Sequence, residues 1–282
     1  MDIEELRAWI GRQERREDVA TAAPLTGLGA TLDHDPVHEY GPGDSVPPRW
    51  HWTYFLPMPR LSSLDADGHP AKGGFLPPIP LPRRMWAGSR IEFLRPLRVG
   101  EKISRLSTIS DVSSKEGRTG SLAFVKRRHE TSNERGVAIV EEQDIVYRSP
   151  LAPGALGPTP TIAPADAQWG RKIKPSAPLL FRYSTLTFNC HRIHYDRPYA
   201  EHDEGYGGLV VHGPLIATLL LDLLRSELPD ARVVGYDFRA VRPLLDTSAF
   251  EVCGRLSGDG TVSLGAKDAD GWVATSATAR LA

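Results

Sequence analysis

The same order of four strands occurs twice in this chain of 282 residues, and this repetition restricts the fold more than any other feature. Alternating apolar and polar residues predict strands at 90–98, 102–112, 120–131 and 137–148, and again at 232–241, 249–256, 261–267 and 272–281. Short glycine-containing turns separate them, so an antiparallel meander is expected in each half. The segment Ile91–Leu97 also aligns with Tyr236–Leu244 when two residues are inserted. Two copies of one folding unit are therefore expected.

The two halves differ in what precedes the strands. Residues 214–228 are apolar on nearly every face, which predicts a helix wrapped by a sheet. Pro214 suits the first turn of this helix, where its missing N–H costs nothing. The corresponding part of the first half, residues 50–86, is rich in aromatic residues and prolines and predicts no long helix. The first half is therefore expected to be a remodelled copy, with the helix better preserved in the second half.

A proline-rich stretch separates the halves. Residues 149–178 hold seven prolines and show no apolar period, which predicts a semi-rigid linker. The expected organisation is a first domain over 1–148, the linker over 149–178 and a second domain over 179–282. At the N-terminus, alternating acidic and basic residues predict a surface helix with Ile3, Leu6 and Ile10 on one face, and no signal peptide.

Charge and cysteine content exclude several classes of protein. The formal net charge is −1 and 40% of the residues are hydrophobic, which is typical of a globular protein without affinity for nucleic acid. The two cysteines, Cys190 and Cys253, fit neither a disulfide framework nor a zinc site, so a reducing, cytoplasmic location is expected. The most apolar stretch, 209–224, is too short and too interrupted to span a bilayer, so no membrane partner is expected.

Residues that could carry chemistry gather between 181 and 212. Four of the nine histidines lie there, together with Asn189, and such clustering marks a candidate site. His191 and His194 are three residues apart and would share one face of a helix, so a metal site with His202 or Asp196 is an alternative. The sequence lacks thiolate pairs and a HExxH pattern, and no metal is expected.

The spacing in this segment resembles the MaoC-like R-specific enoyl-CoA hydratases and dehydratases. Their motif Asp-x-Asn-Pro-Leu-His is followed by His-Gly at the start of a central helix. Here the run from Asn189 to His194 keeps the five-residue interval, and His212-Gly213 precedes the predicted helix. Asn189 departs from the family pattern because it replaces the acid. The resemblance implies an α+β fold, a double hotdog in which each half is an antiparallel sheet around a central helix.

One branch of this family is more similar still. The run TFNCHRIHYDRPYA, RRMWAG at 83–88 and EEQDIVYR at 141–148 resemble the branch containing mesaconyl-C4-CoA (3-methylfumaryl-CoA) hydratase, itaconyl-CoA hydratase and the mitochondrial-type 3-hydroxyacyl-thioester dehydratase. The resemblance covers nearly the whole chain. It implies a hydro-lyase that reversibly adds water across an enoyl-CoA double bond, with mesaconyl-C4-CoA and citramalyl-CoA as the favoured pair. No cofactor is required, because CoA is part of the substrate.

Such chemistry needs a base for the water, a donor to the enolate oxygen and a proton for the α-carbon. His194 is the expected base, since imidazole exchanges protons near neutrality. The N–H of Gly213, at a helix start, is expected to stabilise the oxyanion. Asn189 cannot act as an acid or base but can orient the water. A compensating carboxylate such as Asp196 remains an alternative.

A dicarboxylic acyl group would carry a free carboxylate, which arginine binds best. Candidates for substrate binding are Arg192, Arg84 and Arg182, together with His212 and Tyr195. The first domain is expected to supply the acyl pocket and the second the catalytic motif. Alternatives are an itaconyl-CoA hydratase, a dehydratase of fatty-acid metabolism, thioester hydrolysis on the same fold, and a non-catalytic acyl-CoA binding protein. A monomeric double hotdog or a homodimer is expected.

Overall fold

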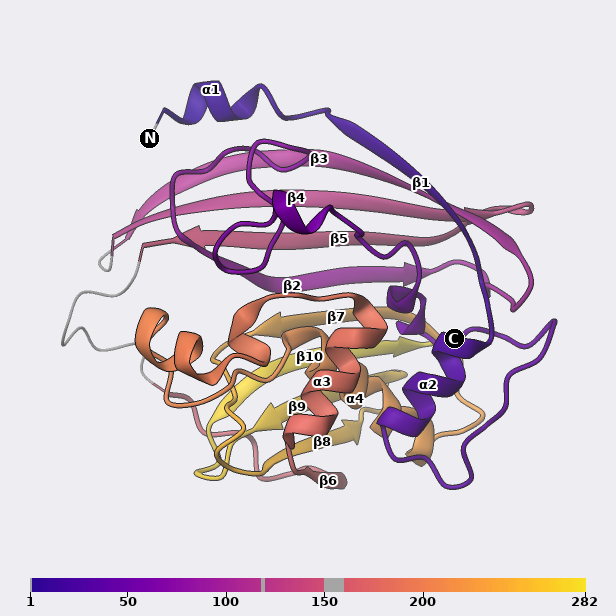
Figure 1. The fold of residues 1–282 in the computed structure, drawn as a ribbon. Helices are drawn as coiled ribbons and strands as arrows, with labels where there is room; N and C mark the ends of the chain where they lie inside the picture. The colour runs from indigo at the N-terminus through magenta and orange to yellow at the C-terminus, as the bar shows by residue number, and fades with distance from the viewer. Residues whose placement is uncertain (1, 118–119, 150–159) are drawn as a thin grey trace.

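The computed structural model describes residues 2–117, 120–149 and 160–282. Ten antiparallel strands form one sheet in the order β1-β3-β4-β5-β2-β7-β10-β9-β8-β6. The first five positions come from the first half of the chain and the last five from the second. The two curved half-sheets join where β2 pairs with β7 (Figure 1).

The first half contains β1 (Gln13–Val19), β2 (Arg83–Phe93), β3 (Lys102–Gly117), β4 (Gly120–Asn133) and β5 (Gly136–Arg148). The second contains β6 (Trp169–Ile173), β7 (Val233–Ala240), β8 (Phe250–Leu256), β9 (Thr261–Lys267) and β10 (Val273–Leu281). The α-helices are α1 (Ile3–Arg7), α2 (Ala23–Thr31), α3 (Ala177–Thr187) and α4 (Gly213–Glu227). Short 3₁₀ turns occupy Trp50–Thr53, Leu61–Ser63 and Arg192–His194, and a π-helical turn occupies Tyr199–Asp203.

All eight predicted strands are present, and their order confirms the predicted double meander. Only β2 is displaced: it runs from Arg83 to Phe93, whereas residues 90–98 were predicted. After Phe93 the chain turns away, and the N–H groups of Leu94 and Arg95 both bond to the carbonyl of Ala138.

The predicted helix at the N-terminus is largely wrong. Helix α1 stops at Arg7, and residues 13–19 form β1 on the edge of the sheet beside β3. Alternating residues of β1 are half-buried and exposed, a period of two that the charged sequence hides. All seven residues from Gln13 to Val19 pair with β3, which lies almost ninety residues further along the chain. This backbone pairing outweighs the local helix propensity of the segment.

The repeat is visible in the register of the central strand pair. Ile91 of β2, which aligns with Tyr236 in the sequence, lies directly opposite Tyr236 of β7. Equivalent residues face each other only on an axis of two-fold symmetry. The alignment therefore identifies the pseudo-two-fold axis that relates the two halves.

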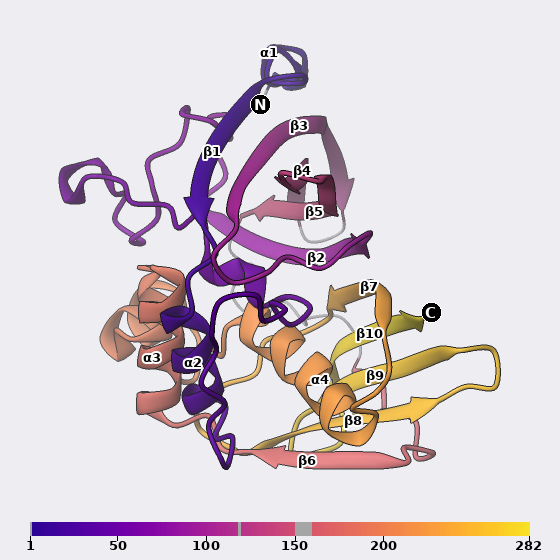
Figure 2. The same ribbon diagram turned by 90° about the vertical axis from the view of Figure 1, so that its right-hand side faces the viewer.

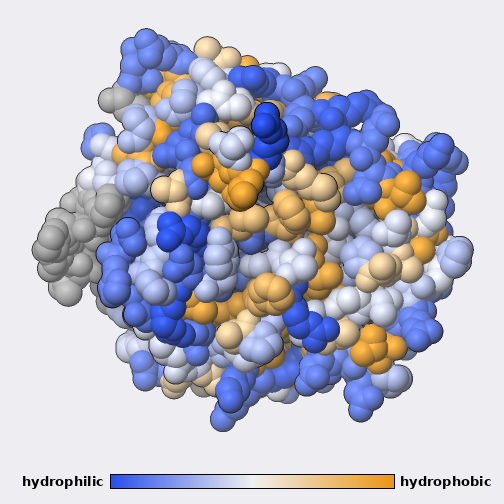
Figure 3. All heavy atoms as spheres, in the orientation of Figure 1, coloured by the Kyte–Doolittle hydropathy of each residue, from blue (hydrophilic) through white to orange (hydrophobic). Residues whose placement is uncertain are grey.

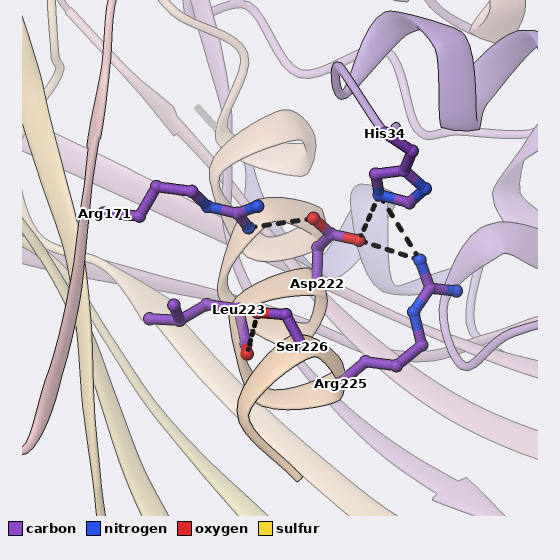
Figure 4. A network of polar contacts seen from close by, with 6 residues as sticks. All are labelled: His34, Arg171, Asp222, Leu223, Arg225 and Ser226. Carbon is purple, nitrogen blue, oxygen red and sulfur yellow. Dashed lines mark hydrogen bonds and ion pairs between the residues drawn. The ribbon is translucent and has the colours of Figure 1, made fainter. Parts of the chain in front are cut away.

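Helix α4 fills the curve of the second half-sheet, as predicted for residues 214–228 (Figure 2). Every residue from Leu215 to Leu224 is buried, including Asp222. The Asp222 carboxylate lies 2.8 Å from each of three groups, on His34, Arg171 and Arg225 (Figure 4). This network ties α4 to the chain after α2 and to β6. No helix among the described residues is long and apolar enough to cross a membrane.

The first half has no counterpart of α4 among its described residues. The single 3₁₀ turn Trp50–Thr53 stands at the equivalent point, and residues 54–82 make a long excursion before β2. Part of this excursion, including Ile79 and Leu81, packs with Leu6 against one end of the first half-sheet. The central helix is thus kept only in the second half, as expected.

Part of the predicted linker belongs to the second half-sheet. Strand β6 pairs with β8, and Ile162 forms a bridge with Trp272. The expected linker over 149–178 therefore ends before β6, and residues 150–159 lie outside the described residues. Both cysteines, Cys190 and Cys253, are free thiols.

Candidate active site

His194, the expected base, is buried at the end of the 3₁₀ turn Arg192–His194. Its Nδ1 lies 2.7 Å from the carbonyl oxygen of Val210. A carbonyl only accepts, so Nδ1 carries the hydrogen and Nε2 keeps its lone pair. Burial lowers the pKa of His194 to about 4, so the ring is neutral near pH 7.

His212 lies behind His194 instead of lining open space. The two rings stack with centroids 3.7 Å apart, and His212 has no exposed surface. Its Nε2 lies 2.8 Å from the hydroxyl of Ser184 on α3. Burial lowers the pKa of His212 well below its ordinary value. His212, predicted to bind substrate, is therefore placed where it holds the ring of His194 in position.

Asn189 and Gly213 flank this pair of rings in the sequence. Asn189 follows the end of α3, and its side-chain oxygen accepts the N–H of His191 at 3.0 Å, which shapes the loop leading to His194. Gly213 begins α4, and the N–H groups of a first helical turn have no acceptor within the helix. A Cβ built on Gly213 would meet no atom within 4 Å, so space is open there for a ligand oxygen.

A segment of the first half reaches this motif. Residues 65–70, which we call the docking loop, bring Asp67 and His69 against the histidines of the second half. The N–H of Arg192 donates to the carbonyl of Asp67 at 2.9 Å, and the Arg192 guanidinium donates to the carbonyl of Ala66 at 2.9 Å. A Cβ on Gly68, whose φ is +87°, would lie 2.0 Å from the carbonyl oxygen of Cys190. The docking loop is therefore in direct backbone contact with the run from Asn189 to His194.

The docking loop carries a carboxylate–imidazole pair. Asp67 Oδ2 lies 2.9 Å from Nδ1 of His69, and Asp67 Oδ1 accepts the His69 backbone N–H at 2.8 Å. Burial alone would raise the pKa of Asp67, but the hydrogen bonds from His69 hold it below its ordinary value. The His69 ring lies 4.1 Å from that of His191, which in turn lies 5.4 Å from that of His194. Burial and the charges of His69 and His194 lower the pKa of His191 to about 2.

Beside this cluster, the inner face of the first half-sheet carries Arg84 and Arg127 together with the buried carboxylate of Glu141. Arg84 of β2 lies opposite Tyr147 of β5, and its charge contributes to lowering the pKa values of both His69 and His191. Burial raises the pKa of Tyr147, and the charges of Arg84 and Arg127 oppose that rise. Within the described residues, the Tyr147 hydroxyl and Nε of Arg127 are buried without a hydrogen-bond partner. The arrangement suits an anion.

Four of the residues considered from the sequence lie elsewhere. Arg192 pairs with Asp196 at 2.8 Å and lies over the ring of Tyr199. The carboxylate of Asp196, the alternative acid, is thereby paired with Arg192. Arg182 is exposed on α3, and Tyr195, which is 50% exposed, donates to the carbonyl of Cys190 at 3.1 Å. Arg192 adjoins the histidines, but its guanidinium is taken up by Asp196 and the docking loop, whereas the charge of Arg84 acts on His69 and His191.

Sequence reasoning missed Asp67, His69 and Tyr147. Potential metal-ligating atoms of Asp67, His69 and His191 lie within 4.8 Å of one another. The direct bond between Asp67 and His69 accounts for their proximity without an ion. An acid and an imidazole two residues apart, separated by glycine, were the available signal for this pair.

A cleft of about 640 Å³ is lined mainly by the first half, and none of the site residues described above lines it. Its lining includes Arg16, Tyr54 and Phe55 from the first half and Thr185 and Leu186 from the end of α3. Apolar side chains gather near the middle of the face shown in Figure 3, among largely hydrophilic surroundings.

The chain forms two half-sheets and keeps one central helix, and neutral imidazoles lie at the start of that helix. These features define a double hotdog of the hydratase and dehydratase class. The sequence profile of hydroxyacyl-thioester dehydratase type 2 matches residues 49–246, and the chain belongs to this family. It is 49% identical to mesaconyl-C4-CoA hydratase of Chloroflexus aurantiacus, over 97% of each chain. It is 26% identical to the mitochondrial hydroxyacyl-thioester dehydratase type 2 of Schizosaccharomyces pombe, over 84% of this chain and 88% of the other.

Solved structures agree on the fold. A MaoC-like dehydratase superposes with a TM-score of 0.73 over 98% of this chain and 100% of its own, at 12% identity. The predicted family and fold class are confirmed, and the protein is a hydratase or dehydratase of acyl thioesters.

Proposed function

We propose that this enzyme hydrates the double bond of mesaconyl-C4-CoA to give citramalyl-CoA, and catalyses the reverse reaction. The observation that carries this proposal is 49% identity over 97% of the chain to a mesaconyl-C4-CoA hydratase. Two features of the site support it: neutral imidazoles beside an open helix N-terminus, and arginines on the inner face of the first half-sheet.

In the proposed reaction, Nε2 of His194 binds the nucleophilic water. Oxygen adds to the β-carbon, and the π electrons move through the α-carbon to the thioester carbonyl. The N–H of Gly213 and the dipole of α4 stabilise the resulting enolate oxygen. Asn189 shapes the loop and keeps its side-chain NH₂ available to orient the reactants. One proton passes from the water to the α-carbon, so nothing but water is consumed.

The free carboxylate of the acyl group would bind at Arg84, with Arg127 and Tyr147 behind it. These donors lie on the inner face of the first half-sheet. A central helix like α4 would cover that face with apolar side chains. A long monocarboxylic acyl chain would bring no charge to pair with the half-buried guanidinium of Arg84, which is costly.

A panel of thioesters tests the proposal: mesaconyl-C4-, itaconyl-, crotonyl- and a C8 enoyl-CoA, followed by loss of enoyl-thioester absorbance. A thiol reagent reports any hydrolysis to free CoA. We expect strong preference for mesaconyl-C4-CoA and no thiol release. His194→Ala should lower kcat by about 10²–10⁴-fold, while His202→Ala, at an exposed histidine of the same segment, should not.

The carboxylate site is tested by Arg84→Gln beside Arg182→Gln as a control. Losing one charge-assisted contact of about 1.5–3 kcal/mol should lower kcat/KM for the dicarboxylic thioester by roughly 10–150-fold. Activity on crotonyl-CoA should change little. Equal losses on both substrates, or a preference for the C8 thioester, would contradict the substrate assignment.

A further inference from the structure

The docking loop places the imidazole of His69, which is bonded to the carboxylate of Asp67, beside a motif in which Asn189 replaces the acid of the family. The loop is held by two hydrogen bonds between Arg192 and carbonyl groups of the loop, and Gly68 permits its close approach to Cys190. A surface loop without a role in the site would not need such contacts. Its placement depends on residues of both halves.

His69 is arranged as a base. Its Nδ1 bonds to Asp67, and because a carboxylate only accepts, the hydrogen lies on Nδ1 and the lone pair on Nε2. No described residue accepts from or donates to that Nε2. The side chain of His69 is 24% exposed, whereas His194 is buried. Nε2 of His69 thus has no protein partner among the described residues, and its side chain keeps some exposure that His194 lacks.

His69 is also better placed than His194 to hold a positive charge during the reaction. An imidazolium at His69 would be stabilised by the carboxylate of Asp67, and charge-assisted bonds are about twice as strong as neutral ones. An imidazolium at His194 would face a neutral carbonyl on one side and the buried ring of His212 on the other. A carboxylate that orients a histidine and stabilises its charged form is the arrangement that makes imidazole an effective base.

We propose that His69, backed by Asp67, is a catalytic residue that carries the proton from the water to the α-carbon. The proposal rests on the proposed hydration. Nε2 of His69 takes one proton as the water oxygen bonds to the β-carbon, while Nε2 of His194 holds the other hydrogen of the water. The imidazolium of His69 then gives that proton to the α-carbon as the enolate electrons return and the thioester carbonyl re-forms. His69 ends neutral, and the balance is one water added.

The charged groups around His69 fix the sign of the test. Burial lowers the pKa of His69 below its ordinary value and Arg84 lowers it further, while Asp67 and Asp65 oppose this and the ring of His191 lies against it. A base must be unprotonated, so activity falls on the acidic side of its pKa. Replacing Asp67 by asparagine removes the main group that raises the pKa of His69, and the acidic limb of the pH profile should move to lower pH.

The experiment compares His69→Gln and Asp67→Asn with the intact protein over pH 5–9, on the most active thioester of the panel. We expect His69→Gln to lower kcat by about 10²–10³-fold with little change in KM. Asp67→Asn should lower kcat less and move the acidic limb by about one pH unit. The matched control is His38→Gln, at an exposed histidine 3.7 Å from Asp44, whose loss should leave kcat unchanged.

Three results would overturn the proposal. One is a His69→Gln variant with the kcat of the parent at every pH. Another is an Asp67→Asn variant whose acidic limb does not move, as expected if His194 alone is the base. The third is a stoichiometric divalent metal in the purified protein whose removal abolishes activity. An intact protein inactive on every thioester would refute the proposed function as well, whereas an active protein insensitive to His69 would refute only this inference.

Discussion

Replacing Gly68 with alanine tests whether the docking loop must touch the catalytic motif. At Gly68 the added Cβ would lie 2.0 Å from the carbonyl oxygen of Cys190, and such contacts do not occur below 3.0 Å. The loop would have to withdraw by about 1 Å, and a misplacement of about 1 Å of a reacting group can cost about 100-fold in rate. Asp67 and His69 flank Gly68 and would move with it. We therefore expect kcat to fall about 100-fold.

Gly73→Ala is a matched control on the same excursion. Gly73 has φ of +91°, close to the +87° of Gly68, so alanine pays a similar conformational cost of roughly 1 kcal/mol at either position. The nearest atom to a Cβ on Gly73 is 3.6 Å away, on Pro78, which is ordinary contact. The two variants should lose similar stability, and only Gly68→Ala should lose activity.

The assay measures kcat and KM on the best thioester together with the midpoint of urea unfolding. The reasoning fails if Gly68→Ala retains the parental kcat, because the loop would then tolerate displacement. It fails equally if Gly73→Ala loses as much activity, since strain anywhere in the excursion would then be the cause.

Three further predictions concern the helix and pH. Asp222→Asn should lower the free energy of unfolding by about 2–3 kcal/mol, measured by denaturant titration. This loss is smaller than the loss expected on breaking a fully buried ion pair, because the cationic partners of Asp222 are 21–34% exposed. Gly213→Ala should be neutral or stabilising, since helical alanine gains up to about 1 kcal/mol, yet its methyl group would occupy the open space at the helix start and lower kcat/KM. Burial lowers the pKa of His129 to about 3 and of His194 to about 4, so both are neutral in the folded protein at pH 5 while their unfolded forms bind a proton below about 6.5. Stability should therefore be constant above about pH 7 and fall as pH decreases, by about 2 kcal/mol per histidine at pH 5; equal unfolding midpoints at pH 7 and pH 5 would contradict this.

Local pattern was enough to predict the strands and the central helix. Period-two alternation and glycine turns are short-range signals, and the apolar run of α4 could only be a helix enclosed on all sides. The repeat alignment made Ile91 equivalent to Tyr236, and in the structure these two residues lie opposite each other. The motif likewise predicted that His194 and His212-Gly213 belong together, and the structure stacks the rings of His194 and His212 at the start of α4.

Features that depend on distant pairing were not predictable in the same way. The sequence of β1 is charged and reads as helical until β3 provides its partner. Asp67 and His69 sit in a sequence typical of a turn, and their role depends on docking against Arg192. Polar residues at core-facing positions of a strand, such as Arg127 in β4, were a readable signal, because an inward arginine needs a partner.

The loss of one helix links these unpredicted features. A central helix in the first half would cover the sheet face that carries Arg84 and Tyr147, and it would use the chain that now forms the excursion over residues 54–82. Without it, the inner face can hold an anion, and the excursion is long enough to bring Asp67 and His69 to the second half. The second half then keeps the helix dipole and His194, and needs no acid at Asn189 because the first half provides a carboxylate. Each half is therefore incomplete alone, and the pairing of β2 with β7 that joins them is as necessary to the chemistry as the motif itself.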